Sequence, residues 1–228
     1  PAGAHPPAAS LGLDGFAPGL MAEGDALALL ARAGVPLVPQ AEAETAGGLA
    51  AAAAALGWPV VLKGVVPGVA HRTERGLVAV GLADEPALRA AAEAMAAANP
   101  DLSGYRLQAM VTGGVELLAG VVRDPHLGPA VALGWGGVLA EAMGAPVVEI
   151  APLDEGIAQA MIDRLDPHGV LAGWRGRPAA DRAALARLLV ALGELAHAGR
   201  ERIAEIDLNP VIVTPDGALA VDAVIVLG

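Results

Sequence analysis

Residues 203–227 read IAEIDLNPVIVTPDGALAVDAVIVL, two largely apolar runs separated by Thr214-Pro215-Asp216-Gly217. Apolar residues that recur with a period of two are typical of β-strands, and a Pro-Asp-Gly sequence is typical of a tight turn. The stretch therefore predicts a β-hairpin, with strands over 203–213 and 218–227.

Oxygen-bearing side chains gather in this hairpin. Asp207 and Asn209 are two residues apart, so they share one face of their strand. A two-residue loop places Asn209 opposite Asp222, with Cβ atoms about 5 Å apart. A three-residue loop instead pairs Asn209 with Ala223 and turns Asp222 to the other face. Such oxygens suit Mg²⁺, which water and phosphates complete, but the spacing alone fits solvent-facing residues equally well.

The segments before the hairpin alternate between strands and helices. Ala-rich or leucine-striped stretches predict helices that begin near Asp25, Ala46, Asp84, Asp154 and Asp181. Short apolar runs bounded by Gly or Pro predict strands over 35–38, 60–62, 77–82, 105–111, 115–123, 130–133 and 147–153. We therefore predict an α+β chain of two lobes with mainly antiparallel pairing. Residues 1–20, rich in Pro, Gly and Ala, predict a flexible linker or tail; the lobes are expected over 21–111 and 112–228.

Composition excludes several classes of protein. The 25 acidic and 14 basic residues give a net charge of −11, which opposes nucleic-acid binding. The longest apolar run, residues 49–62, is interrupted by Gly57 and Pro59 and is too short to span a bilayer, so we expect no membrane partner. The chain has no cysteine and no recognisable secretory signal, which fits a cytoplasmic location.

Two side chains stand where they could handle phosphate. Lys63 ends the apolar strand Val60-Val61-Leu62, and a buried stem can deliver its ammonium group into a cleft. His71 lies in a loop over 64–75, where an imidazole can act as a nucleophile or proton carrier. On chemistry alone, an ordinary surface side chain is the favoured interpretation of each of these two residues.

Common catalytic signatures are missing. Gly134-Trp135-Gly136-Gly137 follows a predicted strand, but it matches neither a Walker A loop nor GxGxxG, so a tight structural turn is favoured over a phosphate cradle. The chain also lacks a GxSxG elbow and an HExxH helix. The usual hydrolase and metalloprotease interpretations therefore have no support.

Several short motifs follow one another along the chain: GWPVVLK (57–63), HRTERG (71–76), QAMV (108–111), GVEL (114–117), GVVRDP (120–125), GG (136–137), WRGRP (174–178) and EIDLNP (205–210). In this order and spacing they resemble one family, the ATP-grasp domain of NDP-forming acyl-CoA synthetases, which includes ADP-forming acetyl-CoA synthetase and, more distantly, succinyl-CoA synthetase. The resemblance extends from about residue 21 to the end.

The resemblance implies an ATP-grasp fold with the nucleotide between two lobes, and roles for individual residues. It implies nucleotide contacts from Lys63, Gln108, Met110, Val111 and Glu116, an Mg²⁺ site at Asp207, Asn209 and Asp222, and a phosphohistidine relay through His71. Lys63 would meet the phosphates of ATP or ADP, residues 108–111 would hold the adenine, and Glu116 would bind the nucleoside. Arg72 and Leu77 depart from the family pattern, which usually has Lys and Gly there.

The resemblance also implies a reaction: acid + CoA + ATP ⇌ acyl-CoA + ADP + phosphate. The chain would handle the nucleotide half, and CoA and the carboxylic acid would bind through a CoA-binding domain or subunit, because no such part is present in this sequence. The Pro-rich start favours a piece of a fused polypeptide. The alternative is a catalytically silent nucleotide-binding sensor or scaffold; a carboxylate-amine ligase is a third hypothesis, which the His71 loop disfavours.

Overall fold

The computed structural model describes residues 11–66, 75–137, 144–173, 176 and 178–228. The chain forms two compact units: Pro1–Leu37 together with Gly113–Gly228 make the larger unit, and Val38–Thr112 make the smaller unit. This division differs from the predicted lobes at residues 21–37, which belong to the larger unit. The reason is that the helix in this segment buries Leu27 and Leu30 in the core of the larger unit.

An antiparallel sheet forms the larger unit. Its strands are β1 (Gly19–Leu20), β6 (Val115–Asp124), β7 (Gly128–Trp135), β8 (Val147–Ile150), β9 (Ile203–Thr214), β10 (Gly217–Ala220) and β11 (Ala223–Leu227). The order is β1-β11-β9-β6-β7-β8, with β10 beside β9. The predicted mixture of helices with mainly antiparallel strands is therefore confirmed.

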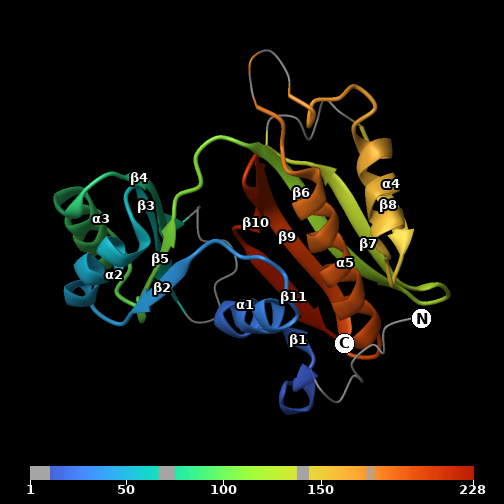
Figure 1. The fold of residues 1–228 in the computed structure, drawn as a ribbon. Coiled ribbons are helices and arrows are strands. Elements are labelled where there is room, and N and C mark those ends of the chain that lie inside the picture. Colours follow the sequence, from blue (N-terminus) through green and yellow to red (C-terminus); the bar gives the residue numbers. More distant parts are fainter. Residues whose placement is uncertain (1–10, 67–74, 138–143, 174–175, 177) are drawn as a thin grey trace. The chain divides into compact units, whose positions relative to one another are not determined.

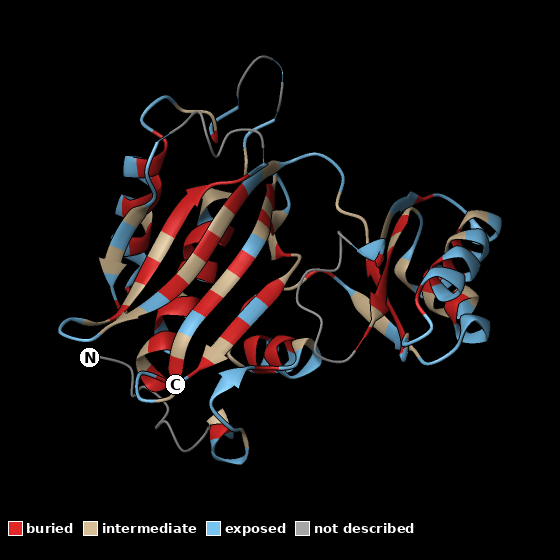
Figure 2. Ribbon diagram, turned by 180° about the vertical axis from the view of Figure 1, so that it is seen from behind, coloured by how far each residue is buried: buried red, intermediate tan, exposed pale blue. Residues whose placement is uncertain are grey.

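Helices cover one face of this sheet. They are α4 (Glu155–Leu165) and α5 (Arg182–Ala198), with α1 (Glu23–Arg32) against β11 and a short 3₁₀ turn, η2 (Leu13–Gly15), before β1 (Figure 1). Asp154 and Asp181 cap α4 and α5 as predicted, each accepting a hydrogen bond from a backbone N–H three residues on. Figure 2 looks onto the opposite face of the sheet. Val122 and Val148 are exposed, whereas the preceding residues Val121 and Val147 pack in or against the core.

A second antiparallel sheet forms the smaller unit. Its strands are β2 (Gln40–Ala43), β3 (Val60–Val65), β4 (Val78–Leu82) and β5 (Gly104–Ala109), in the order β2-β5-β3-β4. The 3₁₀ turn η3 (Ala46–Gly48) leads into α2 (Leu49–Leu56), and α3 (Glu85–Ala98) follows β4. Leu62 and Leu107 of the sheet pack with Leu88 of α3 in one apolar core. One face of this sheet thus packs against the helices.

The predicted strand over 35–38 is wrong. Only Leu37 forms a bridge, with Ala220, and the strand begins later, at Gln40. Pro36 and Pro39 explain the difference, because proline has no N–H to donate to a ladder. Pro36 contributes only as an acceptor, taking a hydrogen bond from the N–H of Ala220 at 2.9 Å.

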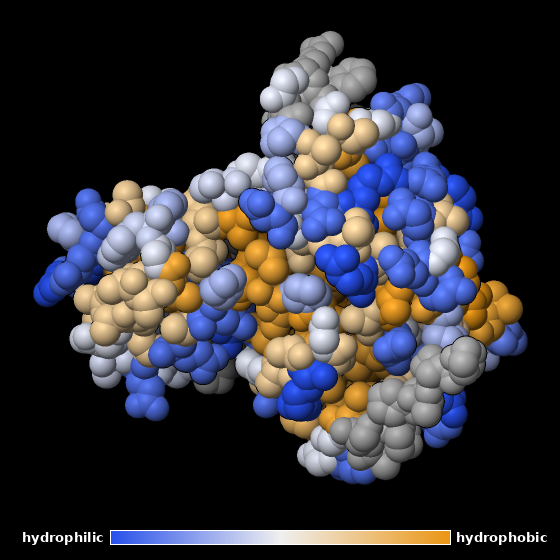
Figure 3. Space-filling view, viewed as in Figure 1, coloured by the Kyte–Doolittle hydropathy of each residue, from blue (hydrophilic) through white to orange (hydrophobic). Residues whose placement is uncertain are grey.

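Among the described residues, no helix is both long enough and apolar enough to cross a bilayer. Figure 3 shows hydrophilic side chains spread over the visible face of both units, mixed with hydrophobic ones.

Gly120 sets the spacing between β6 and β9. It lies opposite Asp207, and a Cβ at this position would come within 2.8 Å of the carbonyl oxygen of Ile206. Because that neighbour is backbone, we expect Gly120→Ala to lower the free energy of unfolding by about 1–3 kcal/mol, measured by urea denaturation. Gly15→Ala is the control, since a Cβ there meets nothing within 4 Å. Equal unfolding midpoints for the two variants would contradict the expectation.

Candidate functional site

The terminal hairpin has the register of the two-residue loop, one of the two alternatives that the sequence left open. Thr214 pairs with Gly217, so the loop has two residues, and Ala223 pairs with Leu208. Between these pairs the N–H of Val221 donates to the carbonyl of Pro210 at 3.0 Å. The register therefore carries Asp222 to a position opposite Asn209, in the short break between β10 and β11. The alternative three-residue loop is excluded.

Asp207 and Asn209 lie on the face of the sheet that points away from the helices. Their neighbours Ile206 and Leu208 are 1% and 0% exposed and belong to the core. Alternation along the strand therefore places Asp207 and Asn209 on the opposite side, together with Glu205. The sequence analysis did not select Glu205, although its position two residues before Asp207 predicts that the two side chains share a face.

The negative charges around Asp207 favour the binding of a cation. Burial raises the pKa of the Asp207 carboxyl, and the negative charges of Glu205 and Asp222 raise it further. The described residues contain no group of three or more His, Cys, Asp or Glu side chains arranged to hold a metal. A metal site here would accordingly combine Asp207 and Asp222 with the amide oxygen of Asn209. This set fits Mg²⁺, which takes few protein oxygens and fills its shell with water and phosphate.

A glycine turn makes room for Glu116. The N–H of Gly136 donates to the Glu116 carbonyl at 2.9 Å, and Gly137 has φ 54°. A Cβ on Gly137 would overlap Oε2 of Glu116, so the carboxylate lies directly over the turn. Glycine is required here both for the left-handed backbone and for this contact. Gly134 and Trp135 are the last residues of β7, so only Gly136 and Gly137 of this segment lie beyond the strand.

The remaining nucleotide-binding candidates lie on the smaller unit. Lys63 is inside β3, two residues before its end, rather than at the end as predicted, and it is 4% exposed. The interpretation as an exposed surface lysine is therefore wrong. Gln108, on β5, is 1% exposed, and its Nε2 donates to Oε1 of Gln40 at 3.2 Å.

Met110 and Val111 directly follow β5. The N–H of Ala109 donates to the Pro39 carbonyl at 2.9 Å, and that of Met110 donates to the Pro59 carbonyl at 3.1 Å. The backbone up to Met110 is thus fixed by its neighbours, and Val111 begins the connection to the larger unit.

Arg106 is a further buried cation that sequence reasoning missed. It is 3% exposed and lies opposite Lys63 in the register of β3 and β5. Its guanidinium donates to Glu42 at 2.5 Å. Only the pairing of the strands could have revealed this neighbour of Lys63.

His71 lies outside the described residues. Arg75, which follows that segment, donates to the carboxylate of Asp101 at 2.8 Å and holds the pKa of Asp101 below its usual range. The described candidates divide between the units: Lys63, Gln108, Met110 and Val111 on the smaller one, and Glu116, Asp207, Asn209 and Asp222 on the larger one.

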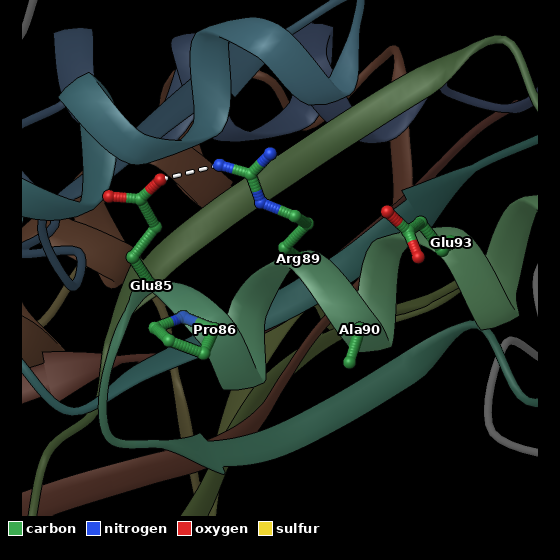
Figure 4. Close-up of a pocket in the computed structure, with 5 residues that line it drawn as sticks. All are labelled: Glu85, Pro86, Arg89, Ala90 and Glu93. Carbon is green, nitrogen blue, oxygen red and sulfur yellow. Dashed lines mark hydrogen bonds and ion pairs between the residues drawn. The ribbon is translucent and has the colours of Figure 1, made fainter.

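A shallow hollow on α3 contains none of these residues. It is lined by Glu85, Pro86, Arg89, Ala90 and Glu93 (Figure 4). Arg89 points toward Glu85 and donates to it at 2.7 Å. Side chains four residues apart on an exposed helix commonly pair in this way, so the hollow has the character of ordinary helix surface.

Comparison with known proteins identifies the family of the chain. The family model described as an ATP-grasp domain matches residues 18–227. The chain is 36% identical over 225 residues to trans-feruloyl-CoA synthase FCS1 of an unknown prokaryotic organism, covering 95% of this chain and 31% of that protein. It is 37% identical over 178 residues to the acetate–CoA ligase (ADP-forming) I subunit beta of Pyrococcus furiosus, covering 75% of this chain and 76% of that subunit. The chain therefore spans about a third of one relative and three quarters of the other.

Solved structures show the same fold. Acetyl-coenzyme A synthetase 1 of Ca. Korarchaeum cryptofilum, in complex with coenzyme A and Ca-AMPCP, superposes with a TM-score of 0.85 at 33% identity, covering 96% of this chain and 97% of that one. Another structure of the same synthetase, with a phosphorylated phosphohistidine segment, has a TM-score of 0.81 at 33% identity, covering 92% and 94% of the two chains.

Proposed function

The chain belongs to the ATP-grasp family, and we propose that it is the nucleotide-binding, phosphoryl-transfer part of an ADP-forming acyl-CoA synthetase. The observation that carries the proposal is the register that sets Asp222 opposite Asn209, on the face shared with Asp207. The full reaction would be acid + CoA + ATP ⇌ acyl-CoA + ADP + phosphate. A CoA-binding domain or subunit would supply the sites for CoA and the acid.

The described residues have distinct tasks in this proposal. Lys63 binds phosphate oxygens, the backbone from Gln108 to Val111 holds the adenine, and Glu116 binds the nucleoside. Asp207, Asn209 and Asp222 hold Mg²⁺, which when bound neutralises charge on the phosphate oxygens. The raised pKa of Asp207 supports this assignment, because a cation relieves the cost of its ionised form.

His71 accepts the phosphoryl group in this proposal. A ring nitrogen attacks the γ-phosphorus of ATP; the N–P bond forms as the P–O bond to ADP breaks, and ADP leaves with the electron pair. The phosphohistidine then passes its phosphoryl group to the CoA-binding part, where the acid is activated. The phosphorylated phosphohistidine segment of the Ca. Korarchaeum cryptofilum synthetase supports this role.

The proposal is tested by incubating the chain with Mg²⁺ and γ-labelled ATP. We expect label on the protein that is lost in acid, survives in base and maps to the peptide that contains His71. Nucleotide binding without any label, even after the CoA-binding partner is added, would instead indicate a silent nucleotide-binding module.

Lys63 provides a second expected result. Lys63→Met keeps the length of the side chain and removes its charge, so we expect affinity for MgADP to fall roughly tenfold while affinity for adenosine stays the same. Isothermal titration calorimetry with both ligands measures the difference. Equal losses for the two ligands would show that Lys63 supports the fold rather than the phosphates.

A further inference from the structure

A buried tryptophan joins the end of strand β7 to the end of helix α4. Trp135 is the last residue of β7 and is 2% exposed. Its indole Nε1–H donates to the carbonyl oxygen of Leu165, the last residue of α4, at 3.2 Å. The last carbonyls of a helix have no partner within the helix, and the indole supplies one for Leu165. The bond thus fixes β7 against α4 at one defined point.

The chain just beyond α4 keeps this carbonyl in place. Asp166 is buried, and its carboxylate accepts the backbone N–H groups of Val170 at 2.7 Å and Leu171 at 2.8 Å. Leu171 is itself part of the core of the larger unit. The segment after α4 is therefore folded back and anchored, so that Leu165 offers Trp135 an acceptor in a fixed position.

The tryptophan directly precedes the glycine turn that contacts Glu116. Trp135 lies opposite Leu117 in the register of β6 and β7, and the N–H of Gly136 donates to the Glu116 carbonyl at 2.9 Å. A Cβ on Gly136 would come within 3.1 Å of backbone atoms of Glu116, and a Cβ on Gly137 would overlap its Oε2. The turn therefore lies in close contact with both the backbone and the carboxylate of Glu116. A shift at the end of β7 would move this carboxylate.

We infer that Trp135 is a positioning residue for Glu116: by anchoring the end of β7 to α4, it fixes the glycine turn that contacts the Glu116 carboxylate. This inference rests on the proposed function, in which Glu116 binds the nucleoside. An indole suits the task, because it combines a large apolar ring that packs in the core with an N–H that takes a partner when buried. Trp135 touches no nucleotide in this role and acts only through Glu116.

A role in the core alone is the alternative. In that case, loss of the indole N–H would lower the stability of the larger unit, and any effect on nucleotide affinity would be independent of Glu116. The positioning role requires instead that the effect depends on the Glu116 carboxylate. A double-mutant cycle separates the two roles, because the effects of independent changes on the binding free energy add, whereas those of coupled residues do not.

The experiment measures the affinity for MgADP by calorimetry in the wild type, the two single variants and the double variant. We expect Trp135→Phe, which keeps an aromatic ring but removes the donor, to weaken MgADP binding about fivefold, and Glu116→Gln to weaken it about tenfold. The double variant should bind MgADP as Glu116→Gln does. Tyr105→Phe is the matched control, because it removes a buried O–H that donates to the Ala92 carbonyl of α3 at 3.2 Å, and it should leave the affinity unchanged.

Gly137→Ala probes the same turn at an exposed position, which covers the case that Trp135→Phe fails to fold. Its Cβ would displace the Glu116 carboxylate, so the affinity for MgADP should fall. Unchanged affinity in Gly137→Ala or in a folded Trp135→Phe variant would overturn the inference, and so would losses that multiply in the double variant. A wild-type chain with no affinity for MgADP would overturn the proposed function together with the inference, so the two failures are distinguishable.

Discussion

Replacing His71 by Ala should abolish phosphorylation of the chain by ATP. The label that we expect is a phosphorus–nitrogen bond on the imidazole, and alanine offers no nucleophile in its place. Nucleotide affinity should remain, because the groups proposed to bind ATP lie on other residues, among them Lys63 and Glu116. Acid-labile, base-stable label after incubation with Mg²⁺ and γ-labelled ATP is the measurement, with nucleotide binding followed in parallel.

His126→Ala is the matched control for this substitution. His126 lies in the turn between β6 and β7, where its backbone N–H donates to Asp124 at 2.8 Å. Removing this imidazole leaves that backbone hydrogen bond in place, so the variant should fold and accept label like the wild type. Undiminished label on the His71→Ala variant would refute the relay through His71.

Features set by neighbouring residues could be predicted from the sequence. Asp84, Asp154 and Asp181 each accept a hydrogen bond from an N–H three residues on, as the capping rule requires. The turn after Thr214 is equally local, because Pro and Gly within four residues fix its backbone. The length of the loop was not decided by these residues, so the position of Asp222 opposite Asn209 was one of two predicted alternatives until the strand pairing settled it.

Features set by distant residues could not be predicted. Arg106 and Glu42 are 64 residues apart, and only the pairing of β2 with β5 brings them together. The burial of Lys63 could not be predicted for the same reason, because burial depends on which distant residues the tertiary fold packs around a strand. Residues 21–37 were assigned to the wrong neighbours for a related reason: an amphipathic helix shows which of its faces is buried, but not which sheet it packs on.

Asp207 belongs to the proposed Mg²⁺ site, although its ionised carboxylate lowers the stability of the fold. Burial and the charges of Glu205 and Asp222 raise its pKa, so the folded chain binds the proton more tightly than the unfolded chain. Ionisation of Asp207 therefore opposes folding at neutral pH. If Asp207 served to stabilise the fold, its ionisation would instead favour folding. A substitution distinguishes a role in stability from a role in binding Mg²⁺.

Asp207→Asn should lower the rate of phosphorylation by ATP roughly 100-fold, because the amide weakens the hold on Mg²⁺ where charge on the phosphoryl oxygens must be neutralised. The thermal unfolding midpoint without Mg²⁺ should stay the same or rise, since the costly charge is gone. Labelling rates over a range of Mg²⁺ concentrations and thermal unfolding provide the two measurements. Asp216→Asn makes the same change at an exposed turn of the same hairpin and should alter neither. A lowered midpoint with an unchanged labelling rate would mean that Asp207 serves the fold, and the Mg²⁺ site would then have to be sought elsewhere.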